Sequence, residues 1–219
     1  MKILFITATR IGDAVQTTGL LGWLMERYPK ARFTIACGAP AAPLLAHAPQ
    51  LARLIVIDKR RAGAHWLGLW ARAAPQVWDL IVDLRGSALA WCLLAKARKV
   101  KFGADPGQHR VRELGALFGL DPPPAPRLWH GPREAQAAAE LIPAGSPVLA
   151  LGPGANWRAK QWRAQSFAEL ARRLTHPSGL LPGARVAVFG APEDRGAALQ
   201  VLGAVPAERR IDLVGLIDL

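Results

Sequence analysis

Cysteine is scarce in this chain, whose 219 residues include only Cys37 and Cys92. The two cysteines are far apart and no histidine cluster accompanies them, which excludes a disulfide scaffold and a zinc ribbon and is typical of a reducing compartment. Long apolar runs are also missing, since none reaches the ~20 residues of a membrane span. The opening residues, 1–6, are too few for the apolar region of a signal peptide and predict a strand. We therefore expect a cytoplasmic protein.

Acidic residues are few as well. Asp and Glu total 16 against 28 Lys and Arg, so the formal net charge is +12 at pH 7. Hydrophobic residues make up 51% of the chain and charged residues 20%, which excludes intrinsic disorder. The positive charge favours an anionic partner: nucleic acid, an acidic membrane or a phosphorylated small molecule. Arg outnumbers Lys by 21 to 7, and guanidinium groups match phosphate oxygens, although a GC-rich genome explains the same bias.

Nucleic acid is the least supported of these partners. The chain has no helix-turn-helix, RNP or zinc signature, and aromatic residues are rare in the basic stretch 96–112, so we expect no nucleic-acid binding. Basic faces instead allow a peripheral contact with the inner face of the inner membrane, where each Lys or Arg near the surface adds about 1 kcal/mol.

Strand-like and helix-like segments alternate from the first residue, which predicts βαβ units and a parallel sheet with helices on both faces. The pattern predicts strands over 3–7, 33–37, 54–57, 80–82 and 100–102, and helices over 14–27, 66–74 and 88–95. The predicted fold class is α/β.

Two breaks divide the chain. The proline-rich residues 121–126 predict a linker, a helix follows over 133–142, and residues 143–147 interrupt the chain again. We therefore predict a first domain over 1–120, a linker with a crossing helix over 121–147, and a second α/β domain over 148–219.

The second domain repeats the α/β pattern. We predict strands over 148–151, 186–189 and 211–214, and a helix over 167–174 that starts at a capping box of Ser166 and Glu169. A doubly wound half takes roughly 120–150 residues, so we expect this second domain to be incomplete in the chain.

The loop from Thr9 to Asp13 is the first candidate site, because ligands bind beyond the carboxyl ends of the strands in an open α/β sheet. Gly12 allows a tight turn. Asp13 suits two roles, a helix N-cap and a general base for a sugar hydroxyl, and the helix N-terminus would weaken it as a base. No G-x-G-x-x-G follows the first strand, which argues against an NAD-binding enzyme.

The loop over 152–162 is the second candidate. Its glycines let backbone N–H groups approach an anion, and Arg158 and Lys160 supply positive charge, so a diphosphate fits. The alternative is a solvated basic loop in which Trp157 and Trp162 are core residues. The loop is not a Walker A motif, because G-K-[ST] is absent.

Further polar residues follow other predicted strands. Asp194 suits either the hydroxyls of a ribose or the first turn of the next helix. The segment 79–87 ends with Arg85 and a glycine at the same edge, and basic residues gather at 59–61 and 96–112. The histidines show no ligand spacing, so we expect no metal and no cofactor.

Three segments carry family-like motifs. Residues 10–18 (RIGDAVQTT) match R-x-G-D-x-x-x-T, residues 79–87 (DLIVDLRGS) resemble the start of D-x-x-I-D-x-Q-G-x-x-x-S, and residues 152–170 resemble H-P-G-A-x-W-x-x-K-x-W…F-x-E-L. Together and in this order they resemble glycosyltransferase family 9, the lipopolysaccharide heptosyltransferases. The chain departs from the family pattern at Gly19 (usually Pro), Arg85 (usually Gln) and Gly152 (usually His).

The resemblance implies a GT-B enzyme, with two Rossmann-like domains, that transfers heptose from ADP-heptose with inversion to the inner core of lipopolysaccharide. It implies Asp13 as the general base and Lys160 as the group that neutralises the leaving diphosphate. The implied donor-binding residues are Thr9, Arg10, Gly12, Gly154, Asn156, Trp157 and Asp194. The basic residues that we expect at an anionic acceptor, the core and lipid A part of lipopolysaccharide, are Arg60, Arg61 and Arg85.

Two alternatives stay open. One is a truncated, non-catalytic relative that binds the lipopolysaccharide core or a partner. The other is a different GT-B enzyme of nucleotide sugars, such as an epimerase.

Overall fold

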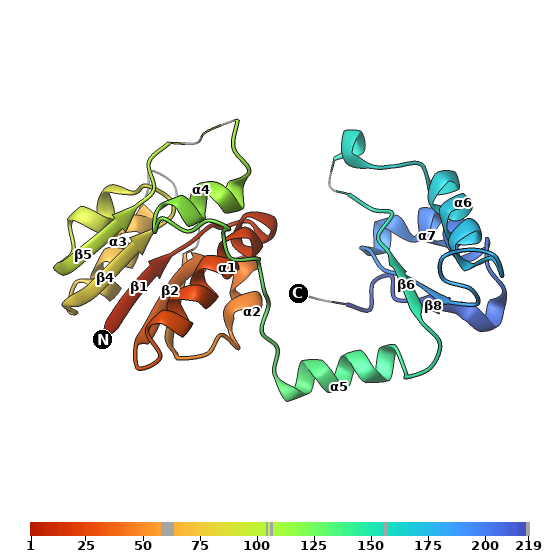
Figure 1. Cartoon of the computed structure of the whole chain (residues 1–219), viewed down its shortest axis with the longest axis horizontal. Helices are drawn as coiled ribbons and strands as arrows, with labels where there is room; N and C mark the ends of the chain where they lie inside the picture. The colour runs from red at the N-terminus through yellow and green to blue at the C-terminus, as the bar shows by residue number, and fades with distance from the viewer. Residues whose placement is uncertain (58–63, 104, 106, 156, 218–219) are drawn as a thin grey trace. The chain divides into compact units, whose positions relative to one another are not determined.

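The computed structural model describes residues 1–57, 64–103, 105, 107–155 and 157–217 (Figure 1). The chain divides into two compact units, Met1–Gly131 and Pro132–Leu219. Each unit is an α/β structure built on its own parallel sheet.

The first unit contains a five-stranded parallel sheet in the order β3-β2-β1-β4-β5. Its strands are β1 (Lys2–Ile6), β2 (Arg32–Gly38), β3 (Leu51–Ile57), β4 (Trp78–Asp83) and β5 (Ala95–Val100). The central strand β1 is apolar and buried at consecutive positions, as expected for a strand that is covered on both faces.

Helices cover both faces of this sheet. On one face, α1 (Ile11–Arg27), α2 (Ala42–Leu45) and α4 (Arg110–Ala116) pack against a cluster that contains Ile3 and Phe5. On the other face, α3 (Ala64–Ala73) and the 3-10 turn η3 (Ala88–Trp91) pack against Leu4 and Ile6. The strand order and the two helical layers are those of a doubly wound Rossmann-like fold.

The proline-rich residues at 121–126 pack along α1. A Cβ atom on Gly19 would lie 2.3 Å from the carbonyl oxygen of Pro124. The backbone N–H of Arg127 donates to Thr18 Oγ1 at 3.0 Å, and the Arg127 side chain pairs with Glu26 at 2.7 Å. The predicted linker therefore begins as an ordered part of the first unit.

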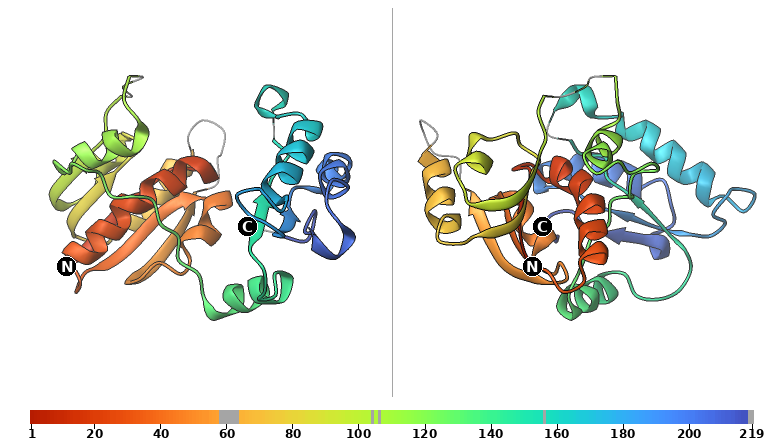
Figure 2. Two further views of the ribbon diagram at one scale, coloured as in Figure 1. Left: turned by 45° about the vertical axis from the view of Figure 1, so that its right-hand side comes forward. Right: turned by 60° about the vertical axis from the view of Figure 1, so that its left-hand side comes forward.

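The second unit contains a three-stranded parallel sheet in the order β6-β7-β8. Figure 2 shows this unit, coloured from green to blue, in two further views. Its elements are α5 (Pro132–Leu141), β6 (Val148–Leu151), η4 (Arg158–Lys160), α6 (Ala164–Thr175), β7 (Arg185–Val188), η5 (Pro192–Asp194), α7 (Arg195–Leu202), η6 (Ala207–Arg209) and β8 (Arg210–Asp212). Ala171 of α6 and Val201 of α7 join Val186 and Val188 of β7 in one apolar core.

Two sequence predictions in the first unit are wrong. The helix expected over 88–95 is only the single 3-10 turn η3, and the strand expected over 100–102 is β5, which begins at Ala95. β5 is an edge strand with the sequence AKARKV, and its alternating exposure hides it from a search for apolar runs. Helix α4 was not predicted from the sequence.

The start of α6 differs from the prediction as well. The helix begins at Ala164, with Arg163 as N-cap and no side-chain cap, so Ser166 and Glu169 form no capping box. Glu169 instead pairs with Arg172 and Arg173 on the surface of the same helix. These pairs hold the pKa of Glu169 below its usual value, chiefly through the hydrogen bond from Arg173.

Candidate functional site

A polar pocket of the first unit lies where the strand order reverses. Chain connections run from β1 through β2 to β3 on one side, and β4 pairs with the other side of β1. Open α/β sheets bind ligands at this switch point, outside the carboxyl ends of the strands. A pocket of about 520 Å³ lies here, between the loops that follow β1, β4 and β5. Its lining residues are Ala8, Thr9, Arg10, Asp13, Leu84, Arg85, Gly86, Lys101, Phe102, Gly103 and Arg110.

The loop after β1 carries Asp13 into this pocket. Helix α1 begins at Ile11 with Arg10 as N-cap, so Asp13 lies in the first turn and is not the N-cap that one interpretation of the sequence predicted. Its side chain is exposed and makes no hydrogen bond or ion pair with any described residue. An exposed carboxylate without a partner can accept a proton from a ligand, which a capping carboxylate could do less readily.

The threonines of the same motif are structural. Thr17 and Thr7 are buried, and their hydroxyl groups form a hydrogen bond of 2.7 Å that joins α1 to the end of β1. Thr18 accepts from Arg127 and donates to the carbonyl of Val15. This packing holds α1, and with it Asp13, in place beside the sheet.

Asp83 shapes the loop after β4. Its buried carboxylate accepts hydrogen bonds from the backbone N–H of Arg85 at 2.8 Å and of Ser87 at 2.9 Å, and from the Ser87 hydroxyl. Gly86 has φ +64°, and a Cβ there would lie 2.5 Å from the carbonyl oxygen of Lys101. The loop therefore turns tightly against the end of β5 and presents Arg85 to the pocket.

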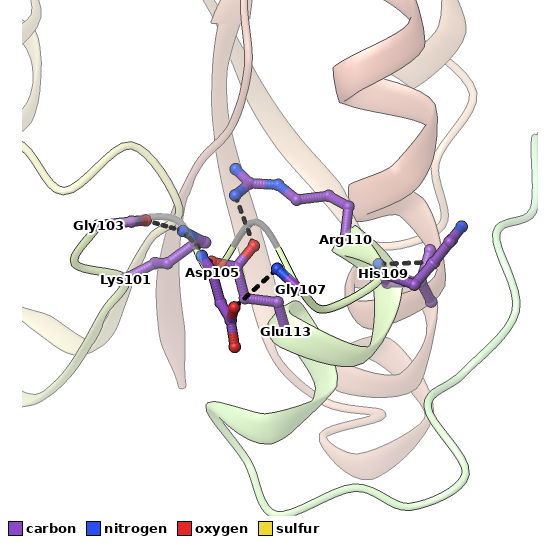
Figure 3. A network of polar contacts seen from close by, with 8 residues as sticks. Lys101, Gly103, Asp105, Gly107, His109, Arg110 and Glu113 are labelled. Carbon is purple, nitrogen blue, oxygen red and sulfur yellow. Dashed lines mark hydrogen bonds and ion pairs between the residues drawn. The ribbon is translucent and has the colours of Figure 1, made fainter.

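The third wall of the pocket contains two cations held by one acid (Figure 3). Lys101 follows β5 and Arg110 opens α4, and both pair with Glu113, at 2.6 and 2.8 Å. The side chains of Lys101 and Glu113 are only 5% and 13% exposed. Burial raises the pKa of Glu113, but the hydrogen bonds from Lys101 and Arg110 outweigh it, so the pKa lies below its usual value.

Four cationic side chains and one carboxylate, that of Asp13, line the pocket. Glu113 neutralises part of the charge on Lys101 and Arg110, whereas Arg10 and Arg85 have no ion-pair partner among the residues described. Burial lowers the pKa of Arg85 and Asp83 opposes that shift, and the guanidinium stays charged at neutral pH. Such a pocket can attract an anionic ligand and accept a proton from it.

In the second unit, two predicted site residues meet. A Cβ atom on Gly154 would lie 2.0 Å from Oδ2 of Asp194, and one on Gly190 would lie 2.8 Å from the same atom. The same oxygen accepts a hydrogen bond from the backbone N–H of Ala191 at 3.0 Å. Asp194 thus fixes the loop after β7 against the loop after β6, and only glycine fits at position 154.

The basic loop of the second unit is exposed. Lys160 and Arg158 lie in η4, and neither forms an ion pair with any residue that the structure describes. Trp157 is 62% exposed and Trp162 52% exposed, so neither is the core residue that the alternative interpretation required. Trp162 contacts Phe167 edge to face, with 5.1 Å between ring centroids.

The sequence prediction and the pocket overlap in part. Thr9, Arg10, Asp13 and Arg85 line the switch-point pocket as predicted site residues, and Gly12 lies in the adjoining turn of α1. Arg60, Arg61 and Asn156 lie outside the described residues. From the sequence, Lys101 and Arg110 were recognised only as members of a basic stretch. A correct prediction of β5 over 95–100 would have placed Lys101 at the carboxyl end of a strand, at the same edge of the sheet as Asp13.

Metal-binding and membrane-spanning features are absent from the described part of the chain. No group of three or more His, Cys, Asp or Glu side chains there could hold a metal ion. No helix within the same residues combines the length and the apolar character that crossing a membrane requires.

The fold is that of known GT-B glycosyltransferases. A glycosyltransferase family 9 protein from Veillonella parvula superposes with a TM-score of 0.79 at 17% identity, covering 99% of this chain and 69% of that one. ADP-heptose lipopolysaccharide heptosyltransferase II of Escherichia coli gives 0.67 at 21% identity, covering 99% and 73%. The predicted α/β class and the GT-B architecture of Rossmann-like domains are confirmed.

Sequence comparison gives the family. The sequence model of glycosyltransferase family 9 (heptosyltransferase) matches residues 84–219. Lipopolysaccharide heptosyltransferase 2 of Salmonella typhimurium is 24% identical over 247 aligned residues, covering 96% of this chain and 69% of that protein, and the Escherichia coli protein of the same name is 25% identical. The chain is a glycosyltransferase and belongs to family 9, the heptosyltransferases.

Proposed function

We propose that this chain transfers heptose from ADP-heptose, with inversion, to the inner core of lipopolysaccharide, with Asp13 as the general base. The observation that carries the proposal is the carboxylate of Asp13, which is exposed and has no partner among the described residues, in a cationic pocket at the switch point of the sheet of a family 9 chain. The same proposal places the enzyme on the cytoplasmic side of the inner membrane.

The base acts on the acceptor. Asp13 takes the proton from a sugar hydroxyl while that oxygen attacks the anomeric carbon of the heptose. The bond from the anomeric carbon to the diphosphate oxygen breaks on the opposite face, which inverts the configuration. No metal is required in this scheme, because the negative charge that develops on ADP meets fixed cations.

Fixed cations and backbone groups bind the donor. Thr9, Arg10 and Gly12 contribute from the first unit, and Lys160 neutralises the leaving diphosphate. We also assign donor binding to Gly154, Asn156 and Trp157, because a glycine-containing loop lets backbone N–H groups approach a phosphate. Asp194 accepts from the ribose with Oδ1, since Oδ2 is engaged by Ala191.

The acceptor is anionic in this proposal, and Arg85 meets it within the pocket. We also assign acceptor binding to Arg60 and Arg61, which lie outside the described residues. One relative, the heptosyltransferase WaaC of Escherichia coli, has been solved both with ADP and with ADP-2-deoxy-2-fluoro heptose, and these ligands support the choice of donor.

The Asp13→Asn variant tests the role of the base. We expect it to retain donor binding and to lose about 10²–10⁴-fold in transfer rate, the usual contribution of a general base. The measurement is the formation of the heptosylated product from ADP-heptose and a heptose-deficient lipopolysaccharide acceptor, with donor affinity measured separately.

Glu26→Gln is the matched control, because Glu26 is an exposed acid in the last turn of the same helix and should leave the rate unchanged. Equal rates for Asp13→Asn and the unaltered chain would overturn the role of Asp13. Acceptor binding without transfer by the unaltered chain would favour the non-catalytic alternative. Conversion of the donor sugar without acceptor would favour an epimerase.

A further inference from the structure

A second, apolar pocket adjoins the switch-point pocket. It has a volume of about 660 Å³, which lies within the range of about 300–1,000 Å³ of small-molecule sites. Residues of α3 and of the segment around η3 form its walls: Trp66, Leu67, Trp70, Arg85, Gly86, Ser87, Ala88, Leu89 and Cys92. Arg85 and Gly86 also line the pocket of Asp13, so the two pockets meet at these residues.

Arg85 lies at this junction and forms no ion pair with a described residue, although the charge of Asp83 favours its charged form. Its guanidinium lies over the ring of Trp66, 4.8 Å from the centroid. Its Nη1 is buried and has no hydrogen-bond acceptor in the part of the chain that is described. A buried donor without an acceptor is unfavourable, and a ligand oxyanion would satisfy it with a charge-assisted hydrogen bond.

The rest of the pocket suits hydrocarbon. Leu67 and Trp70 are large apolar side chains that remain 71% and 44% exposed. The indole N–H of Trp70 already donates to the carbonyl of Cys92, so it offers no free donor. Sugar hydroxyls in this pocket would find few partners, and unsatisfied hydroxyls are costly, whereas burial of a hydrocarbon chain is favourable.

We propose that this pocket is a subsite for the hydrocarbon part of an anionic amphiphile whose phosphate or carboxylate pairs with Arg85. The hydroxyl to be glycosylated then lies in the adjoining pocket, near Asp13. The identification of this amphiphile as the acceptor of the transferred sugar rests on the proposed function. The subsite itself rests on the junction of the two pockets and on the buried Nη1 of Arg85, which has no acceptor among the described residues.

Three probes below their micellar concentrations test the proposal by isothermal titration calorimetry: dodecyl phosphate, butyl phosphate and a neutral dodecyl glycoside. We expect dodecyl phosphate to bind at least about tenfold more tightly than either of the others, because only it offers both a chain and a charge. If butyl phosphate bound as tightly as dodecyl phosphate, the pocket would recognise the phosphate alone. If the neutral dodecyl glycoside bound as tightly as dodecyl phosphate, the binding would be nonspecific adsorption of a detergent. Either result overturns the proposal.

Variants assign the binding to the pocket. Arg85→Gln should weaken dodecyl phosphate at least about tenfold and leave the neutral glycoside unchanged. Leu67→Ser, a change at an exposed helix position, should weaken both dodecyl compounds. Arg72→Gln is the control, because it removes one positive charge, as Arg85→Gln does, from a residue of α3 that does not line this pocket. It should leave the affinity for both dodecyl compounds unchanged. Unaltered dodecyl phosphate affinity in Arg85→Gln, with its fold checked by circular dichroism, would overturn the assignment.

The two proposals fail separately. Asp13→Asn should lower the transfer rate about 10²–10⁴-fold and leave dodecyl phosphate binding intact. Selective amphiphile binding in a chain that transfers no heptose would overturn the proposed function alone. Transfer with no preference for the anionic amphiphile would overturn the subsite alone.

Discussion

Three acidic side chains at the switch point have different surroundings and therefore different chemistry. Asp83 is buried and accepts backbone hydrogen bonds, so it holds a loop. Glu113 is almost buried between two cations and holds Lys101 and Arg110 beside the pocket. Asp13 is exposed without a partner among the described residues, which leaves its oxygens available to a ligand. Only the last arrangement suits a general base.

The Glu113→Gln variant tests the buried ion pairs. The amide is neutral, so Lys101 loses its buried counter-charge, and we expect unfolding to become easier by about 1–3 kcal/mol at pH 7. Because the pKa of Glu113 lies below its usual value of 4.5 in the folded chain, its stabilisation is fully present above that value. It is lost as the pH falls through the folded pKa.

Urea denaturation of both proteins between pH 3 and pH 7 measures this difference. The two stabilities should converge at the acidic end of the range. A gap that stays constant over the whole range would show that Glu113 does not act through its charge.

At the scale of elements, close contact between α1 and the proline-rich segment orders the end of the first unit. Gly19 and Gly22 leave room on α1, where a side chain would meet the backbone of Pro124 and Ala125 or the side chain of Arg127. Prolines in that segment cannot continue a helix, and their extended backbone follows the surface of α1. The departure from the family pattern at Gly19 thus has a packing reason in this chain.

The Gly19→Ala variant tests this contact. Alanine favours helix by about 1 kcal/mol over glycine, but its Cβ would lie 2.3 Å from the Pro124 oxygen, so the segment must move. We expect a net destabilisation of about 1–3 kcal/mol, typical of overpacking, and faster proteolysis near residues 121–127.

Gly12→Ala is the matched control, since nothing lies within 4 Å of a Cβ at that position of the same helix. Its stability should stay the same or rise. A Gly19→Ala protein as stable as Gly12→Ala would contradict the packing argument.

For the molecule as a whole, the net charge of +12 predicts attraction to acidic lipid surfaces. Each Lys or Arg near such a surface contributes about 1 kcal/mol, and salt screens the attraction beyond a distance of about 10 Å at 0.1 M. We expect the chain to sediment with vesicles that contain anionic lipid at low salt and to dissociate as the salt concentration rises.

Vesicles of neutral lipid are the control for this sedimentation experiment and should leave the protein in the supernatant. Equal sedimentation with both kinds of vesicle would contradict the electrostatic origin. Failure to sediment with anionic vesicles at low salt would remove the membrane contact from the proposal.

Local patterns predicted most of the framework. The apolar strand β1, the long helix α1 and the proline-rich break are each determined by residues close together in sequence, and the structure contains all three. The edge strand β5 and the start of α6 were mispredicted. Charged residues alternate along β5, and the capping pattern at Ser166 lies inside a helix that begins at Ala164.

The sequence by itself determined the α/β class, the family motifs and the position of Asp13 after the first strand, because these depend on residue type and spacing alone. Tertiary structure decided which motif residues are free to act. Strand order brings the loops after β1, β4 and β5 to one edge, and this places Lys101 and Arg110 beside Asp13 while the motif threonines become buried. Pairing between distant strands follows from packing of the whole unit, which no local pattern encodes.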